Sequence, residues 1–321
     1  MARDFFHTGL NIARSQVASL IGGLGPGTIY YVDYRNGSDS YDGLSWGRAL
    51  RTYGKAISMV TSNNNDVILI DGDSTVVETA MVSITKNRVH TIGMNGALGH
   101  YGQGAKISIG VTTAATDIAC IQNTGVRNTF TGIKVISDNE VAEGLYAFAE
   151  GGEFSRFFNC EFYKSTDLDE TAAAEFLHNG DSAMFYNCTF GSTANIIASA
   201  KIRANVLLTA TLSGKKCRDS YFENCLFLSK AGGSQHVKVY GANATDVERM
   251  LIFKDCTFFN NILSAGTPSH AVGFGSAQTE GAVLLKNCTS VDHTVMAQAA
   301  VGIYVDGAVP TFATTGVSKA A

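Results

Sequence analysis

Acidic residues gather at three places where carboxylate chemistry could take place. They are Asp167, Asp169, Glu170 and Glu175, then Asp138, Glu140 and Glu143, and finally Asp71 and Asp73. Two carboxyl groups about 5 to 9.5 Å apart can hydrolyse a glycosidic bond. The first two groups follow successive copies of a repeat described below, so they are expected on one side of the molecule. Asp167, Asp169 and Glu170 are the catalytic candidates if the protein cleaves polysaccharide, whereas solvated loop charge is the simpler interpretation.

A metal site is the second candidate chemistry. The run from Asp33 to Asp42 offers several side-chain oxygens at short spacing, which suits calcium. It has no Glu at the twelfth position of a calcium loop, and its Asn, Gly, Ser and Asp residues are those of tight turns. The histidines at 7, 90, 100, 178, 236, 270 and 293 are scattered, and no Cys-x-x-Cys pair is present. The sequence therefore favours turn chemistry over calcium and predicts no cofactor.

A six-residue repeat indicates the elements that would position such residues. Each copy places Asn or Asp directly before Cys, and the copies are Phe157–Phe162, Phe185–Phe190, Phe222–Phe227, Phe253–Phe258 and, more weakly, Leu285–Ser290. The segment Phe130–Val135 fits the same frame, with Gly132 for Asn and Ile133 for Cys. Repeats at roughly 20 to 50 residues indicate a solenoid.

The pattern inside each copy predicts two short strands joined by a bend. Apolar residues alternate with polar ones, as in a half-buried strand. Phe185 and Phe190 differ in parity, so the chain must bend near Asn187, and Asn tolerates the left-handed backbone that such a bend needs. This arrangement is one corner of a parallel β-helix, in which coils lie about 4.8 Å apart and like residues stack. Asn side chains are then expected to hydrogen-bond along the stack, with Phe and Cys inside it.

The spacing of the copies predicts loops on every coil. Successive repeat cysteines are 28, 37, 31 and 32 residues apart. A bare coil needs roughly 20 to 25 residues, so each coil carries extra chain of the kind that often holds a binding site. Earlier strands are expected at Val67–Ile70 and within Ile84–Ile92. We therefore expect eight or nine coils within residues 67–305, followed by a small C-terminal tail at 306–321.

Two segments precede the coils. Residues 28–66 contain an apolar face of Trp46, Ala49, Leu50, Tyr53, Ala56, Ile57 and Val60, which predicts one amphipathic helix capped by Ser45. Such a helix would cover the open end of the stack. Residues 1–27 form an arm with a narrow apolar stripe followed by a glycine-rich joint. The stripe either packs on the solenoid or, as we expect, binds a partner, and it includes Phe6, Leu10, Val17 and Leu20.

Composition excludes several classes of partner. The net charge is −4, only 16% of residues are charged and no basic stripe occurs, which argues against nucleic acid binding. No run of 18 apolar residues is present, so no membrane helix is expected. Arg14 and Gln16 interrupt the apolar part of residues 1–27, unlike a signal peptide. Assembly in a reducing cytoplasm is the simplest expectation, with the repeat cysteines as small buried free thiols.

One string carries a family resemblance. Residues 31–46 read Tyr-Val-Asp-x-x-Asn-Gly-Ser-Asp-Ser-x-Asp-Gly-x-Ser-Trp, followed by Ala49-Leu50-Arg51-Thr52 and Ala56-Ile57. This string resembles the N-terminal cap of right-handed parallel β-helix proteins of the pectin-lyase-like superfamily, and the repeats resemble its coils. The resemblance covers residues 28 to about 305. It implies an all-β, right-handed parallel β-helix with an N-terminal capping helix and an N-terminal arm.

The same resemblance leaves the function open, because this superfamily includes polysaccharide lyases, glycoside hydrolases, phage tailspikes and virion proteins without activity. The chain looks most like phage virion-associated β-helix proteins. We expect a structural virion protein, either a capsid decoration or a spike or tail component, assembled in the host cytoplasm. A homotrimer held by the arm to a major capsid or tail protein is expected. The alternatives are a tailspike-type depolymerase of host surface polysaccharide and a carbohydrate-binding adhesin.

Overall fold

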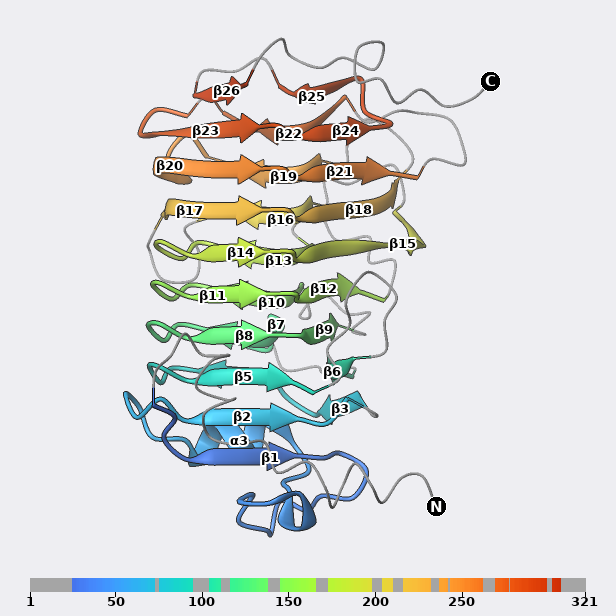
Figure 1. Ribbon diagram of the computed structural model, residues 1–321. Coiled ribbons are helices and arrows are strands. Elements are labelled where there is room, and N and C mark those ends of the chain that lie inside the picture. Colours follow the sequence, from blue (N-terminus) through green and yellow to red (C-terminus); the bar gives the residue numbers. More distant parts are fainter. Residues whose placement is uncertain are drawn as a thin grey trace.

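The chain winds into a right-handed parallel β-helix (Figure 1). The computed structural model describes residues 25–72, 75–94, 104–110, 116–137, 145–165, 173–197, 204–209, 216–231, 237–241, 243–261, 269–276, 278–298 and 302–306. The arm residues Phe6, Leu10, Val17 and Leu20 and the tail beyond residue 306 lie outside this part. The expected fold class is confirmed for the coils and for the helix at their N-terminal end.

Three parallel sheets run the length of the stack. Sheet A contains, in spatial order, β1 (Ile29–Val32), β2 (Val67–Ile70), β5 (His90–Gly93), β8 (Thr129–Thr131), β11 (Arg156–Phe158), β14 (Met184–Tyr186), β17 (Cys217–Glu223), β20 (Val247–Lys254), β23 (Gly281–Lys286) and β26 (Ile303–Val305). Sheet B contains β3 (Thr75–Glu78), β6 (Ala105–Ile109), β9 (Ile133–Ser137), β12 (Glu161–Lys164), β15 (Thr189–Ile197), β18 (Leu226–Ala231), β21 (Thr257–Asn260) and β24 (Thr289–Val291). Sheet C contains β4 (Val82–Ile84), β7 (Ala119–Asn123), β10 (Tyr146–Glu150), β13 (Ala174–His178), β16 (Ala204–Leu208), β19 (Val237–Gly241), β22 (His270–Phe274) and β25 (Val295–Ala297).

Each coil takes one strand from each sheet in the order A, B, C. Equivalent residues of neighbouring coils are paired in register, so that Phe157 faces Phe185 and Phe185 faces Phe222. We call the bend between strands of sheets A and B the A–B corner, and we name the other two corners in the same way. The six-residue repeat of the sequence spans the A–B corner in every copy.

The A–B corner is built on a left-handed residue. Asn159, Asn187 and Asn224 have φ values of 52°, 53° and 53°, and Asp255 and Asn287 continue the column with similar values. Asn187 Nδ2 donates to Asn159 Oδ1 over 2.6 Å, and Asn224 Nδ2 donates to Asn187 Oδ1 over 3.3 Å. The Asp255 side chain has no N–H to donate toward Asn224, although its Oδ1 accepts from Asn287 Nδ2 at 2.6 Å. The predicted bend and asparagine ladder are confirmed, with an interruption where Asp replaces Asn.

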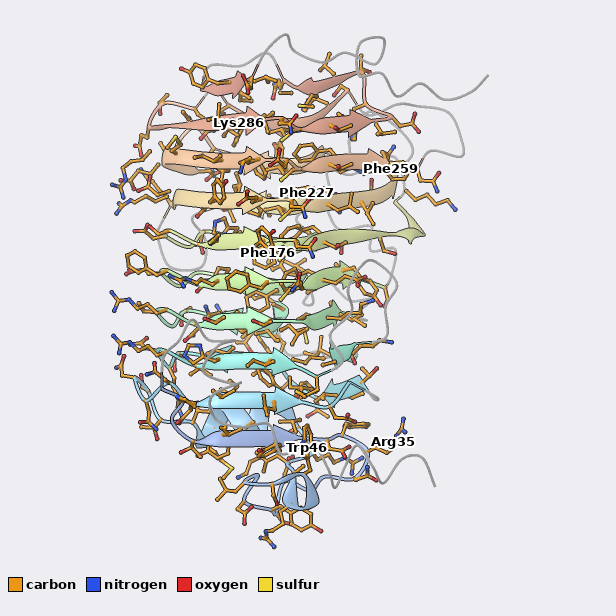
Figure 2. All side chains as sticks on the ribbon, viewed as in Figure 1. Arg35, Trp46, Phe176, Phe227, Phe259 and Lys286 are labelled. Carbon is orange, nitrogen blue, oxygen red and sulfur yellow. The ribbon has the colours of Figure 1, made fainter. Side chains whose placement is uncertain are left out.

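Phenylalanine columns fill the interior. The rings of Phe157, Phe185, Phe222 and Phe253 stack along sheet A, with centroid distances of 4.7, 4.2 and 4.7 Å between successive rings. Phe190 and Phe227 belong to a second column on sheet B, and their centroids are 5.1 Å apart. The two columns meet edge to face, which suits the charge distribution of aromatic rings. Phe176 and Phe227, labelled in Figure 2, are fully buried in this interior.

The repeat cysteines form a column beside the rings. All seven cysteines are free thiols, six of them buried. Cys188 Sγ lies 3.5 Å from the carbonyl oxygen of Phe157 in the coil below, and Cys225 Sγ lies 3.6 Å from that of Phe185. The interpretation of these residues as core filler is confirmed.

The N-terminal end is covered by a shorter helix than predicted. The helix α3 (Tyr53–Met59) buries Tyr53, Ala56 and Ile57 at the end of the stack, as expected of a cap. Thr52, not Ser45, caps it, because its side chain accepts from the backbone N–H of Lys55. The single longer helix was wrong. Residues Trp46–Arg48 form a separate 3₁₀ turn, η1, and Leu50 is extended beside β1 because its backbone bonds to Tyr31 and Asp33.

Substitution of Asn187 tests the corner geometry. We expect Asn187→Ala to lower the free energy of unfolding by about 1–3 kcal/mol, because Ala is strained at φ 53° and removes the ladder hydrogen bonds. Asn187→Gly loses the same hydrogen bonds without backbone strain, so it should be the more stable of the two. Urea unfolding followed by circular dichroism measures both variants. A Gly variant less stable than the Ala variant would contradict a strained corner.

Candidate functional site

A groove of about 130 Å³ follows the outer side of the A–B corner over several coils. The asparagine ladder forms its floor, and the first outward-facing residues of sheet B form one wall. Its lining residues are Gly104, Gly132, Ile133, Lys134, Asn159, Cys160, Glu161, Asn187, Cys188, Thr189, Asn224 and Leu226. Amide, hydroxyl, ammonium and carboxylate groups therefore meet within one narrow surface channel.

An ion pair lies in this groove. Lys134 Nζ is 2.6 Å from Glu161 Oε2, and the two side chains are only 10% and 13% exposed. Lys134 Nζ also lies 5.5 Å from the centre of the Tyr163 ring, a cation–π contact. Burial raises the pKa of Glu161 above its usual range, although the hydrogen bond and charge of Lys134 pull it down. Glu161 is the one carboxylate among the described groove residues, so the pair of carboxyl groups needed for hydrolysis is not assembled from them.

This pair was missed in the sequence, although a signal for it was present. The frame that aligns Ile133 with Cys160 also aligns Lys134 with Glu161, as the strand register shows. Opposite charges one coil apart in a β-helix must face each other across about 4.8 Å. Comparing the residue after each repeat Cys would have identified the contact.

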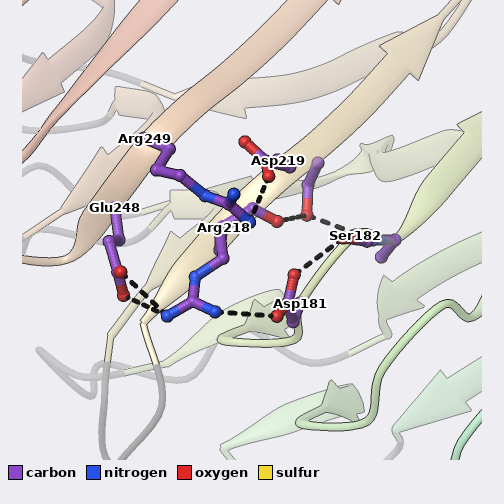
Figure 3. Close-up of polar contacts among 8 residues, drawn as sticks. Asp181, Ser182, Arg218, Asp219, Glu248 and Arg249 are labelled. Atoms are coloured by element: carbon purple, nitrogen blue, oxygen red, sulfur yellow. Dashed lines mark hydrogen bonds and ion pairs between the residues drawn. The ribbon is translucent and has the colours of Figure 1, made fainter.

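A second charged cluster lies on the outside of the C–A corner (Figure 3). Arg218 Nη2 lies 2.8 Å from Glu248 Oε1 on one neighbouring coil, and Arg218 Nη1 lies 3.3 Å from Asp181 Oδ2 on the other. Arg249 Nη2 is 2.5 Å from Asp219 Oδ2. The hydrogen bond from Arg218 holds the pKa of Glu248 below its usual range. These charges bridge three successive coils and satisfy one another.

Inside the same corner is a buried polar column. Glu150 is completely buried and accepts from Asn123 Nδ2 at 2.8 Å, from the Gly152 N–H at 2.7 Å and from Ser155 Oγ at 3.0 Å. One coil further, His178 Nε2 and Ser220 Oγ share a hydrogen bond of 2.9 Å. Both His178 and Glu150 are fully enclosed, so they fasten the corner and are not available to an external ligand.

The predicted acidic clusters are only partly described. Asp167, Asp169 and Glu170 lie outside the described residues, as do Asp138, Glu140, Glu143 and Asp73. Glu175 was wrongly assigned to a solvated loop: it lies in β13, is 3% exposed, and accepts from the backbone N–H of Lys164. Its inward position follows from the strand register, which the loop assignment ignored.

The carboxylates of the Asp33–Asp42 run are occupied by turn and capping hydrogen bonds. Asp33 accepts from the N–H groups of Arg35 and Asn36. Asp39 accepts from the N–H groups of Arg51 and Thr52, and Asp42 accepts from Leu44 N–H and pairs with Arg48. The turn interpretation is confirmed.

No three His, Cys, Asp or Glu side chains within the described ranges are grouped closely enough to hold a metal ion. No helix in that part of the chain has the length and apolar character to cross a membrane.

Comparison with known proteins adds evidence on the fold. No protein-family model matches this sequence, and no curated protein sequence matches it. Among solved structures, pectate lyase Pel9A is similar, with a TM-score of 0.57 and 14% identity over 93% of this chain and 80% of that chain. A pectin methylesterase from Aspergillus niger reaches a TM-score of 0.56 at 12% identity, covering 89% of this chain and 87% of that one. A rhamnogalacturonan lyase reaches 0.51 at 14% identity, with 85% and 77% coverage.

These likenesses show a shared fold and nothing finer, because every identity is below 15%. The parallel β-helix architecture expected from the cap string and the repeats is therefore confirmed by structure as well as by sequence pattern.

The buried His178 makes stability depend on pH. Burial lowers its pKa to about 3, whereas the unfolded chain titrates near 6.5. Because the folded pKa is the lower one, the unfolded state takes up the proton first, and stability is lost as pH falls below about 6.5. From pH 7 to pH 5 this residue should remove about 2 kcal/mol.

The measurement compares urea unfolding of the wild type and His178→Gln at both pH values. The stability difference between the two proteins should shift by that amount in favour of the variant at pH 5. An unchanged difference would mean that the pKa of His178 is the same in the folded and unfolded states, and it would contradict the lowering by burial.

Proposed function

We propose that the chain is a structural, non-catalytic protein of a bacteriophage virion, either a capsid decoration or a component of a spike or tail. The observation that carries this proposal is that charged side chains on the surface form ion pairs between neighbouring coils. Ion pairs join neighbouring coils at Lys134–Glu161, Asp181–Arg218–Glu248, Asp219–Arg249 and Glu223–Lys254. Charged side chains that pair with one another between coils stabilise a rigid scaffold. A catalytic cleft instead needs charged side chains that are free to interact with a substrate.

The outer face of sheet A supports assembly with further copies. Parallel sheets are usually covered on both faces. Here a row of partly exposed apolar side chains includes Phe158, Met184 and Ile252, and Tyr186 and Tyr304 are 41% and 59% exposed. A homotrimer that packs these faces together would cover them. The arm at residues 1–27 is the proposed anchor to a major capsid or tail protein.

A glycan-binding adhesin is the second candidate, and the groove at the A–B corner favours it. Asparagine amides, the Thr189 hydroxyl and the Lys134–Glu161 pair can exchange hydrogen bonds with sugar hydroxyls, and Tyr163 supplies an aromatic ring nearby. The fold is shared with proteins named for action on pectin, so a host surface polysaccharide is the ligand to test. The depolymerase alternative rests on Asp167, Asp169 and Glu170.

Deletion of residues 1–25 tests the structural proposal. The deleted protein should keep the circular dichroism signal of strands, because the cap and coils make their own contacts, yet should fail to join particles that incorporate the full chain. The measurement is co-sedimentation with particles of the parent phage that lack this protein. Loss of the strand signal, or incorporation equal to that of the full chain, would contradict the anchor.

Incubation with host polysaccharide separates the alternatives. Shortened chains or unsaturated ends, abolished when Asp167, Asp169 and Glu170 are changed to Ala, would overturn the structural proposal in favour of the depolymerase. Binding without cleavage that is lost in Lys134→Met and kept in Lys254→Met would establish the adhesin. Lys254 is the matched control because it is also paired, with Glu223, but lies outside the groove.

A further inference from the structure

A buried lysine and a buried asparagine meet inside the B–C corner. Ser229 lies near the end of β18 in sheet B, Asn260 is the last residue of β21 in the same sheet, and Lys238 is the second residue of β19 in sheet C. All three side chains are completely buried. A lysine without solvent contact is rare, because its ammonium form loses its hydration.

The contacts among the three groups form a short relay. Lys238 Nζ donates to Ser229 Oγ, and it lies 3.5 Å from Asn260 Oδ1. Ser229 Oγ donates to the same Asn260 Oδ1 over 2.7 Å. The amine is thus held against the carboxamide while a hydroxyl polarises the carbonyl that an amine would attack.

The surroundings keep the amine in its nucleophilic form. Burial lowers the pKa of Lys238 well below its usual range, although the negative charge of Glu175 pulls it up. Burial also lowers the pKa of nearby His293 well below its usual range, so this imidazole is neutral as well. Neighbouring Phe227 and Phe258 are fully buried and exclude water. A neutral lysine amine in an apolar site is a competent nucleophile.

We propose that Lys238 and Asn260 form an intramolecular isopeptide bond. Nζ attacks Cγ of Asn260, and the Ser229 hydroxyl stabilises the oxygen that becomes negative in the tetrahedral intermediate. The Cγ–Nδ2 bond then breaks, and the proton released from Nζ passes through Ser229 to Nδ2. One N–C bond forms, one N–C bond breaks, ammonia leaves, and no oxidant or reductant is consumed.

The bond would tie β19 to β21 of the next coil. It closes a loop of chain within the last third of the stack, and a cross-link of this kind limits the freedom of the unfolded chain. The chemistry depends only on the three side chains, so it stands whether or not the proposed virion role is correct. The mass of the purified full chain decides it.

The intact protein, reduced before mass spectrometry, should be lighter than its sequence by one ammonia. Digestion should yield a single branched peptide that contains both Lys238 and Asn260. Lys238→Met should have the full mass of its sequence. Lys164→Met is the matched control, because Lys164 is also buried and lies 3.4 Å from a serine hydroxyl, that of Ser137; it should keep the ammonia loss.

Succinimide formation at an Asn–Gly pair, such as Asn36–Gly37 or Asn179–Gly180, also releases ammonia. It would persist in Lys238→Met and would give no branched peptide, and this result would overturn the proposal. A wild-type protein with the full sequence mass would overturn it as well. If Lys238→Met does not fold, the peptide map of the wild type alone gives the answer.

Discussion

Everything in this molecule depends on the stacking of like residues between coils about 4.8 Å apart. The register is maintained because Phe157, Phe185, Phe222 and Phe253 lie over one another, with every ring fully buried. A slip of one residue would turn these rings toward water and the polar residues inward. The left-handed asparagine at the A–B corner makes this possible, since it lets both flanking strands direct a phenylalanine into the interior.

The same constraint determines what the surface can do. A charge on one coil lies directly over the equivalent residue of the next, so opposite charges pair between coils, as Lys134 and Glu161 do. Arg218 pairs with Asp181 on one neighbouring coil and with Glu248 on the other, so this ion-pair cluster spans three coils. Inside the stack, stacking brings Lys238 against Asn260 with no route to solvent. The regular scaffold thus produces both the ion pairs between coils on the exterior and the buried contact of Lys238 with Asn260.

Much of the fold could be predicted because each six-residue copy of the repeat contains its own pattern of apolar and polar residues, which depends only on neighbours in the sequence. The parity change between Phe185 and Phe190 indicated the bend, and Asn indicated its backbone conformation. The helix at the cap was mispredicted because Leu50 fits a helical apolar face equally well, while its tertiary hydrogen bonds to β1 place it in an extended segment. Glu175 was misjudged because an acidic residue near a loop was taken as solvated, whereas it lies within β13, all of whose residues are buried. The Lys134–Glu161 pair depends on contacts between coils, which single-strand patterns do not reveal.

The central claim is that the phenylalanine columns hold the coils in register. Paired substitutions at neighbouring positions of one strand test it most directly. Phe185 is fully buried in the column, whereas Tyr186 is 41% exposed on the outer face of the same sheet. Urea unfolding should show that Phe185→Ala lowers the free energy of unfolding by about 3–5 kcal/mol, and Tyr186→Ala by about 1 kcal/mol or less. Equal losses from the two substitutions would contradict the account.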